Sequence, residues 1–200
     1  MLEGDKLIMS LIELMEYRRS IRKYLTKQID DESLNKIIYA GELAPNAGGG
    51  QRSKIVAIQN AEILNNLGKL NALGMRGVKL EGNYVSKEQP SLIDDPTIKS
   101  GFYGAPTVIA IFTPKNFLYG EADAYCIAEN MLLEATDLNI QSCVIARGIE
   151  TFENEYGKSL KEQWSIPEFY TCKAFVLLGY INGEYPHKKP IKENRSMIIR

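Results

Sequence analysis

The stretch Thr107-Val108-Ile109-Ala110-Ile111-Phe112 decides the fold, because it is an almost unbroken run of β-branched and apolar residues. A run of this kind predicts a central strand that is packed on both faces. Residues 121–139 follow it and keep apolar side chains at helical spacing over roughly 27 Å of helix. Three small residues give this helix a narrow face on which a second helix can pack closely: Ala124, Ala128 and Ala135.

Further elements are predicted on either side of this strand and helix. The other strands are expected at residues 54–59, 142–146 and 172–179. Helices are expected at residues 10–18, 32–43 and 61–73, with an amphipathic segment around Leu160 and Trp164. A glycine-rich loop comes directly before the first of these strands. The dinucleotide-binding fingerprint needs the order strand, loop, helix, so we reject a Rossmann fold.

Length and composition indicate one domain over residues 1–200, without a general attraction to nucleic acids or membranes. The 24 basic and 25 acidic residues give a net charge of −1, so any anion site must be local. Three irregularly spaced cysteines indicate free thiols in a reducing, cytoplasmic compartment rather than disulfides or a zinc site. The chain starts with the acidic residues Glu3 and Asp5 and has no long apolar run. We therefore expect neither a signal peptide nor a membrane span.

The segment Arg18-Arg19-Ser20-Ile21-Arg22 places three guanidinium groups and a hydroxyl directly after a short apolar helix. A guanidinium binds phosphate through two hydrogen bonds at once, and serine adds a hydroxyl donor. This composition therefore suits a phosphate monoester. The alternative is a solvated basic helix end, which the helix dipole favours. The five residues alone leave both interpretations open.

Three further segments have more than one interpretation. The loop Pro45-Asn46-Ala47-Gly48-Gly49-Gly50-Gln51 is expected to be neither helix nor strand, and its bare backbone suits either a close-fitting ligand loop or a flexible linker. Residues 74–100 are polar and rich in turn residues, which indicates a cover over a substrate or a mobile insertion. The tail at residues 183–200 ends in Met197-Ile198-Ile199 and is expected to pair with a sheet edge, its own or a partner's.

The order of these motifs resembles the FMN-dependent nitroreductase family over nearly the whole chain. The resemblance rests on the order and spacing of the motifs taken together. The matching segments are residues 18–24, 44–51, 102–106 before a strand, 130–133 within a helix, and 189–192.

The resemblance implies FMN as the cofactor and a set of residues that contact it. Arg18 and Ser20 would hold the phosphate and ribityl end, Arg22 would face the ring, and the backbone amide at Arg147-Gly148 would approach flavin N5. The full set of expected contacts is Arg18, Arg19, Ser20, Arg22, Asn46, Ala47, Gly48, Gly49, Gln51, Ile145, Arg147, Gly148, Lys189 and Lys192.

The sequence departs from the family pattern at two places. In the second flavin loop, Gly49 stands where an asparagine is usual, and Arg52-Ser53 replaces a Pro-Trp pair. Recognition of the flavin there would depend on the backbone and on Gln51. In the tail, Ile191 stands where an arginine is common, which weakens the assignment of Lys189 and Lys192.

The resemblance also implies an α+β fold with a mainly antiparallel sheet flanked by helices, in an intertwined homodimer that exchanges C-terminal strands. The expected activity passes hydride from NADH or NADPH through flavin N5 to a flat small molecule such as a nitroaromatic or a quinone. The alternatives are a flavin reductase for a dedicated substrate, such as an ene, and a non-catalytic flavin-binding storage or sensor protein. No catalytic side chain or metal is needed, and His187 in the basic tail is not expected to act as a base.

Overall fold

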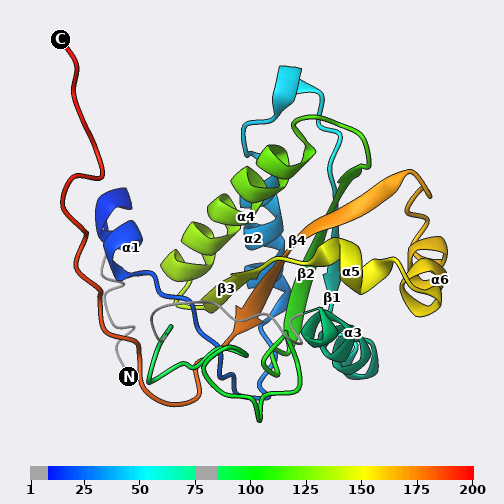
Figure 1. The fold of residues 1–200 in the computed structure, drawn as a ribbon, viewed down its shortest axis with the longest axis horizontal. Helices are drawn as coiled ribbons and strands as arrows, with labels where there is room; N and C mark the ends of the chain where they lie inside the picture. The colour runs from blue at the N-terminus through cyan, green and yellow to red at the C-terminus, as the bar shows by residue number, and fades with distance from the viewer. Residues whose placement is uncertain (1–8, 75–84) are drawn as a thin grey trace.

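Strands β2 (Thr107–Pro114) and β4 (Tyr170–Gly179) form the centre of an antiparallel sheet. The computed structural model describes residues 9–74 and 85–200, and its four strands lie in the order β1-β2-β4-β3 (Figure 1). Strand β1 (Lys54–Ile58) is one edge and β3 (Gln141–Ile145) is the other. The three pairings between these four strands are antiparallel, which confirms the expected sheet and excludes the parallel Rossmann arrangement.

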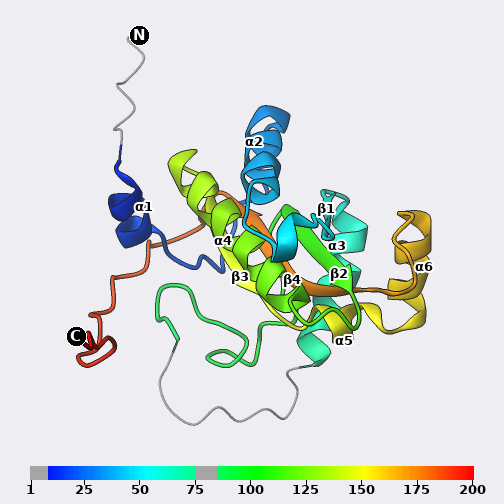
Figure 2. The ribbon, with the colours of Figure 1, turned by 90° about the horizontal axis from the view of Figure 1, so that it is seen from above.

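Helices cover both faces of this sheet, so the expected double burial of the central strand is confirmed. Side chains alternate along β2: Ile109 and Ile111 face α2 (Asp31–Glu42) and α4 (Gly120–Asp137), and every second residue faces the other way. The opposite face packs against α3 (Ala61–Leu73), α5 (Gly148–Phe152) and α6 (Glu155–Gln163). Figure 2 shows these two helical layers with the sheet between them.

Helix α4 packs closely against α2, and Ile127, Asn130 and Met131 of α4 lie at this contact. Ala124, Ala128 and Ala135 are all buried. A side chain at Gly41 of α2 would overlap Met131, so the glycine permits close approach of the two helices. The polar Asn130 finds a partner at this contact, where its Nδ2 donates to the Ala40 carbonyl at 3.0 Å.

Most element boundaries agree with the sequence-based expectation, but three details differ. The loop at 45–51 contains one 3₁₀ turn, Ala47–Gly49, in which Gly48 has φ 60°. Strand β4 begins at Tyr170, two residues earlier than expected, because its pairing with β2 continues to Pro114. Helix α5 was not predicted, since five residues of mixed polarity carry no clear helical period.

The N-terminal helix α1 (Leu11–Tyr17) and the tail lie against each other. The expected capping box is present, with Glu13 N–H donating to Ser10 Oγ and Ser10 N–H donating to the Glu13 carboxylate. The Tyr185 ring stacks on Tyr17 with centroids 5.0 Å apart, and Lys188 Nζ lies 2.9 Å from Glu16. The middle of the tail is therefore held by its own chain.

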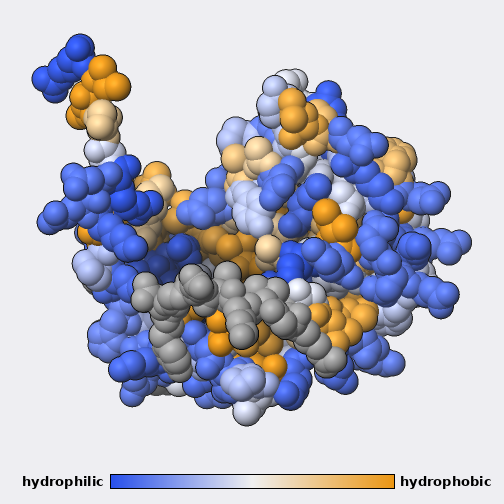
Figure 3. All heavy atoms as spheres, in the orientation of Figure 1, coloured by the Kyte–Doolittle hydropathy of each residue, from blue (hydrophilic) through white to orange (hydrophobic). Residues whose placement is uncertain are grey.

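The end of the tail has a different environment. Met197, Ile198 and Ile199 are 84%, 79% and 88% exposed. The C-terminal end of the tail projects away from the body of the chain (Figures 1 and 3). Among the described residues, the tail pairs with no strand. Its apolar end thus lacks the sheet edge that its composition favours.

Residues 85–100, called the cover segment below, contain no helix or strand. His187 Nδ1 lies 2.9 Å from the Glu88 carboxylate, and Lys189 Nζ donates to the Val85 carbonyl, so the tail holds the start of this segment. Residues 75–84 of the expected cover, and the acidic start at Glu3 and Asp5, lie outside the described residues. Within the described residues, no helix has the length and apolar character needed to cross a membrane.

The contact between cover segment and tail should depend on pH. The hydrogen bond with His187, together with backbone and Ser86 hydrogen bonds, lowers the pKa of Glu88 from 4.5 to about 2. The folded state then binds fewer protons than the unfolded state, so this stabilising contribution is complete above about pH 4.5 and is lost as the pH falls towards 2.

His187→Ala should therefore lower the urea midpoint at pH 5.5 but make little difference at pH 2.5. Lys87→Ala, an exposed neighbour of Glu88, is the control and should change neither value. An equal effect of His187→Ala at both pH values would contradict the assignment.

Candidate active site

The arginine segment, residues 18–22, lies along the beginning of edge strand β3. Ile21 is fully buried, and its N–H donates to the Ser142 carbonyl at 3.0 Å. Ser20 forms an isolated parallel bridge with Ser142. The buried isoleucine thus anchors the segment, and the polar residues on either side of it are held next to the sheet edge.

The three arginines of this segment have different environments. Arg19 Nη1 donates to the carbonyls of Glu16, Tyr17 and Arg18 at 2.7, 3.0 and 2.7 Å, so its side chain caps the end of α1. The Arg22 guanidinium lies 3.4 Å from the carbonyls of Ser20 and Gln89. Among the described residues, the Arg18 guanidinium makes no hydrogen bond. Arg18 is therefore the arginine most available to a ligand.

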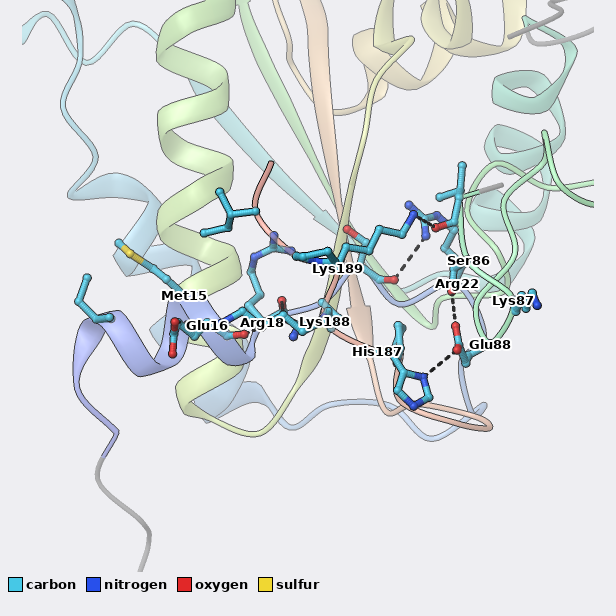
Figure 4. A pocket seen from close by; sticks show the side chains of 17 residues that line it. Met15, Glu16, Arg18, Arg22, Ser86, Lys87, Glu88, His187, Lys188 and Lys189 are labelled. Atoms are coloured by element: carbon cyan, nitrogen blue, oxygen red, sulfur yellow. Dashed lines mark hydrogen bonds and ion pairs between the residues drawn. The ribbon is translucent and has the colours of Figure 1, made fainter. Parts of the chain in front are cut away.

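These residues line a groove of about 830 Å³ between α1, the cover segment and the tail (Figure 4). A volume of this size is within the usual range for small-molecule sites. The groove brings together Arg18, Arg19, Ser20, Arg22 and Lys189, all expected from the sequence. Lys192 is exposed and does not line the groove, whereas Ile191 does.

The groove carries more positive than negative charge. Its two carboxylates, Glu16 and Glu88, are each paired with a tail residue, Lys188 and His187 respectively. These pairs leave the Arg18 guanidinium as a donor for an anion. The arrangement therefore suits a phosphate better than a cation.

Gln89 is a structural residue of the site that the sequence alone did not indicate. Its side chain is fully buried, where Oε1 accepts from the Arg22 N–H at 2.8 Å and Nε2 donates to the Glu184 carbonyl at 3.2 Å. It thereby links the arginine segment to the tail. Its partners are 67 and 95 residues away in the sequence, so no local pattern could have identified it.

The Arg147-Gly148 turn follows the other end of β3, with Ile145 buried as the last residue of the strand. The turn and the arginine segment are separated by five strand residues. At the usual rise of a β-strand, this is about 17 Å. The backbone of Arg147 has a left-handed conformation, with φ 64° and ψ 34°. A Cβ on Gly148 would lie 2.6 Å from the Cys172 carbonyl oxygen, so this position requires glycine.

Three titratable groups in and near β3, Cys143, Tyr24 and Tyr103, stay neutral around pH 7. Burial raises the pKa of the Cys143 thiol and raises the pKa of Tyr24 well above its usual value. Burial also raises the pKa of Tyr103, which lies within electrostatic range of both Arg22 and Arg147. These groups supply uncharged, apolar support to the strand rather than a nucleophile.

The glycine loop at 45–51 lies far from this groove in the same chain. Its Ala47 N–H donates to the Asp123 carboxylate at 3.0 Å, in the first turn of α4, whereas the arginine segment lies beyond the last turn of α4. The two places are roughly a helix length apart, about 27 Å for 18 residues. One chain therefore does not bring Asn46, Ala47, Gly48, Gly49 and Gln51 to Arg18 (Figure 1).

The glycine loop nevertheless exposes bare backbone. Gly48 and Gly49 have φ values of 60° and 61°, and added side chains there would meet nothing within 4 Å. Asn46 Oδ1 accepts from the Gln51 N–H at 2.9 Å and closes the loop. Arg52 donates to the Ala47 carbonyl at 3.0 Å, and its guanidinium lies over the Phe117 ring.

Comparison with known proteins agrees with this architecture. A crystal structure of a nitroreductase with bound FMN from Bacteroides fragilis has a TM-score of 0.80 with this chain at 24% identity, covering 96% of this chain and all of the other. A nitroreductase with bound FMN from Desulfitobacterium hafniense has a TM-score of 0.78 at 21% identity, with the same coverage. At these identities the two structures show that the fold is shared.

Sequence comparison shows the family. A relative from Archaeoglobus fulgidus, named as a candidate NADH dehydrogenase/NAD(P)H nitroreductase, is 28% identical over 173 residues, which is 86% of each chain. The model of the Nitroreductase family matches residues 15–180, from the end of α1 to the end of the sheet. The chain therefore belongs to the Nitroreductase family and is an oxidoreductase.

Proposed function

We propose that this oxidoreductase uses FMN to pass hydride from NADH or NADPH to a flat small molecule such as a nitroaromatic or a quinone. One observation carries the proposal. Edge strand β3 has a groove with several cationic side chains at its beginning and a left-handed turn with a required glycine at its end. A phosphate at one end and a ring system at the other would match the two ends of FMN.

The donor groups of the groove fit this cofactor. Arg18 and Lys189 are cations suited to a phosphate. Ser20, two residues after Arg18, lines the same groove and adds a hydroxyl donor. The pairing of Glu16 and Glu88 with tail residues reduces repulsion of an anion. Two relatives of known structure with this fold contain FMN, which supports the assignment.

Each residue would then have a distinct role. Arg18, Ser20 and Lys189 would anchor the phosphate and ribityl end, and Arg22 would place positive charge near the ring. Such a charge stabilises an anionic reduced flavin, most strongly where water is excluded. Bound FMN would supply the hydride chemistry at N5. The Gly148 N–H would be the backbone donor directed at N5.

We further propose that the active unit is a homodimer. The glycine loop cannot reach the arginine segment of its own chain, so the contacts expected of Asn46, Gly48 and Gln51 would be made with the FMN of a second copy. The exposed apolar end of the tail supports the same arrangement, because a partner could bury it. The free cysteines fit a reducing, cytoplasmic location.

The bare glycine loop favours one alternative acceptor class. Gly48 and Gly49 present backbone without side chains and have open space around them in the single chain, so in the proposed homodimer the loop would leave room beside the FMN of the second copy. That space supports a dedicated substrate, such as an ene, as the second candidate. A panel in which nitroaromatics and quinones fail and an activated alkene is reduced would favour it.

The proposed function has a direct test. Purified protein supplied with FMN should be yellow and should oxidise NADH or NADPH when a nitroaromatic or a quinone is added. A protein that cannot be loaded with FMN would refute the proposal. Bound FMN that neither nucleotide reduces would instead indicate a storage or sensor protein.

Arg18→Ala should weaken FMN binding. Loss of a hydrogen bond to a charged group costs about 1.5 to 3 kcal/mol, which is roughly a tenfold to hundredfold increase in Kd. Arg22→Ala should also lower occupancy. Lys23→Ala is the matched control, because it removes the same charge from an exposed neighbour that does not line the groove. Fluorescence titration measures all three, and unchanged binding in both arginine variants would contradict the phosphate site.

Removal of residues 193–200 should weaken the dimer. This truncation deletes the exposed apolar end but leaves Tyr185, Lys188 and Lys189, which contact their own chain. Light scattering after size-exclusion chromatography should show that the truncated dimer dissociates into monomers at a higher protein concentration than the full-length dimer does. Glu193→Ala is the control and should behave as the full chain does. A truncated protein that stays a stable, FMN-loaded dimer would exclude the proposed exchange of tails.

A further inference from the structure

Asn71 is hydrogen-bonded to the Arg147-Gly148 turn at several points, although it belongs to none of the sequence motifs. It is fully buried in the last turns of α3. Its Nδ2 lies 3.0 Å from the Ala146 carbonyl, 3.0 Å from Thr151 Oγ1 and 3.5 Å from the Arg147 carbonyl. In return, Arg147 donates from Nη2 to Asn71 Oδ1 at 2.8 Å and from Nε to the Asn71 carbonyl at 3.2 Å. One residue thus holds both the backbone and the side chain of Arg147.

The surroundings of Asn71 are shaped to fit its side chain. A Cβ on Gly101 would overlap Asn71 Oδ1, so that position must lack a side chain. The Gly101 N–H donates to the Gly68 carbonyl at 2.8 Å, and a side chain on Gly68 would overlap Ser100. The loop before β2 therefore closes directly over α3 and excludes alternative positions for the Asn71 amide.

The contacts converge on one peptide group. The Arg147 carbonyl accepts from the Thr151 hydroxyl at 2.7 Å and from the Thr151 N–H at 3.2 Å, in addition to Asn71. The Arg147 carbonyl and the Gly148 N–H belong to the same planar peptide unit and point in opposite directions. Fixing the carbonyl therefore fixes the direction of the N–H. Among the described residues, the Gly148 N–H has no acceptor of its own.

These hydrogen bonds to the Arg147 carbonyl matter because the turn has an unfavourable backbone conformation. Arg147 has left-handed φ and ψ values, which residues with a side chain rarely adopt. Without the contacts from Asn71 and Thr151, the peptide could rotate towards a commoner conformation. The Gly148 N–H would then lose its fixed direction.

We propose that Asn71 is a positioning residue for flavin reduction, which orients the Gly148 N–H by holding the Arg147 carbonyl. This inference rests on the proposed function, in which that N–H is directed at flavin N5. Asn71 does not touch the cofactor in this assignment. It acts through the turn, and Thr151 acts with it.

Two variants test the inference in the FMN-loaded protein. Asn71→Asp retains the acceptor for Arg147 and a similar volume but removes the Nδ2 donor. Thr151→Val retains the volume and removes the hydroxyl. Leu67→Val, also fully buried on α3 but with an apolar side chain that donates no hydrogen bond to the turn, is the control for a merely structural effect. Thr151→Ser, which keeps the hydroxyl, should rescue the properties of the wild type.

Three quantities are measured: FMN affinity, the single-turnover rate of flavin reduction by NADH or NADPH, and the flavin midpoint potential. Asn71→Asp and Thr151→Val should bind FMN within about threefold of the wild type, because the phosphate groove is untouched. Reduction should slow about tenfold. The ratio of affinities for oxidised and reduced FMN should change about tenfold, which is about 30 mV for a two-electron couple. Leu67→Val should lower the melting temperature and leave the potential unchanged.

The possible failures are distinguishable. A wild-type protein that does not bind FMN, or whose FMN is not reduced, refutes the proposed function and the inference with it. A wild type that turns over, together with an FMN-loaded Asn71→Asp or Thr151→Val whose potential and reduction rate equal those of the wild type, refutes only the inference. An equal shift of potential in Leu67→Val would also overturn it, because the effect would then follow from general loosening of α3.

Discussion

The hydrogen bond from the Ile21 N–H to the Ser142 carbonyl is the contact on which the site depends. It attaches a segment without regular structure to the edge of a sheet whose two central strands are covered on both faces. The buried Ile21 side chain adds apolar burial to this attachment. Flexible arginine side chains then start from a backbone that the sheet holds in place. The same strand continues to the Arg147-Gly148 turn, so one rigid element spaces both ends of the site.

Local sequence patterns predicted the elements that hold the site. The bounds of α3 agree with the expected helix at residues 61–73, and the capping box at Ser10 and Glu13 is present. The run at residues 107–112 is the buried central strand. These predictions succeeded because periodicity and capping are properties of neighbouring residues. The resemblance to nitroreductases gave the antiparallel α+β sheet, which periodicity could not have supplied.

The residues that the sequence did not reveal act through distant contacts. Gln89 and Asn71 are ordinary amides in the sequence, yet each is fully buried and joined to residues more than 60 positions away. The role of Arg19 was also hidden, because its neighbours suggest a ligand whereas its guanidinium caps α1. Buried amides must satisfy their hydrogen bonds, and the partners are set by the tertiary fold rather than by local sequence.

The length of α4 sets the spacing between the glycine loop and the arginine segment. Insertion of a single residue into this helix would turn everything beyond it by about 100° and move it by about 1.5 Å, which would take the buried side chains of α4 out of their places against α2 and the sheet. Indels should therefore be tolerated poorly in α4. The cover segment has no regular structure to disturb, so variation in length among relatives can accumulate there without changing the distance between the two ends of α4.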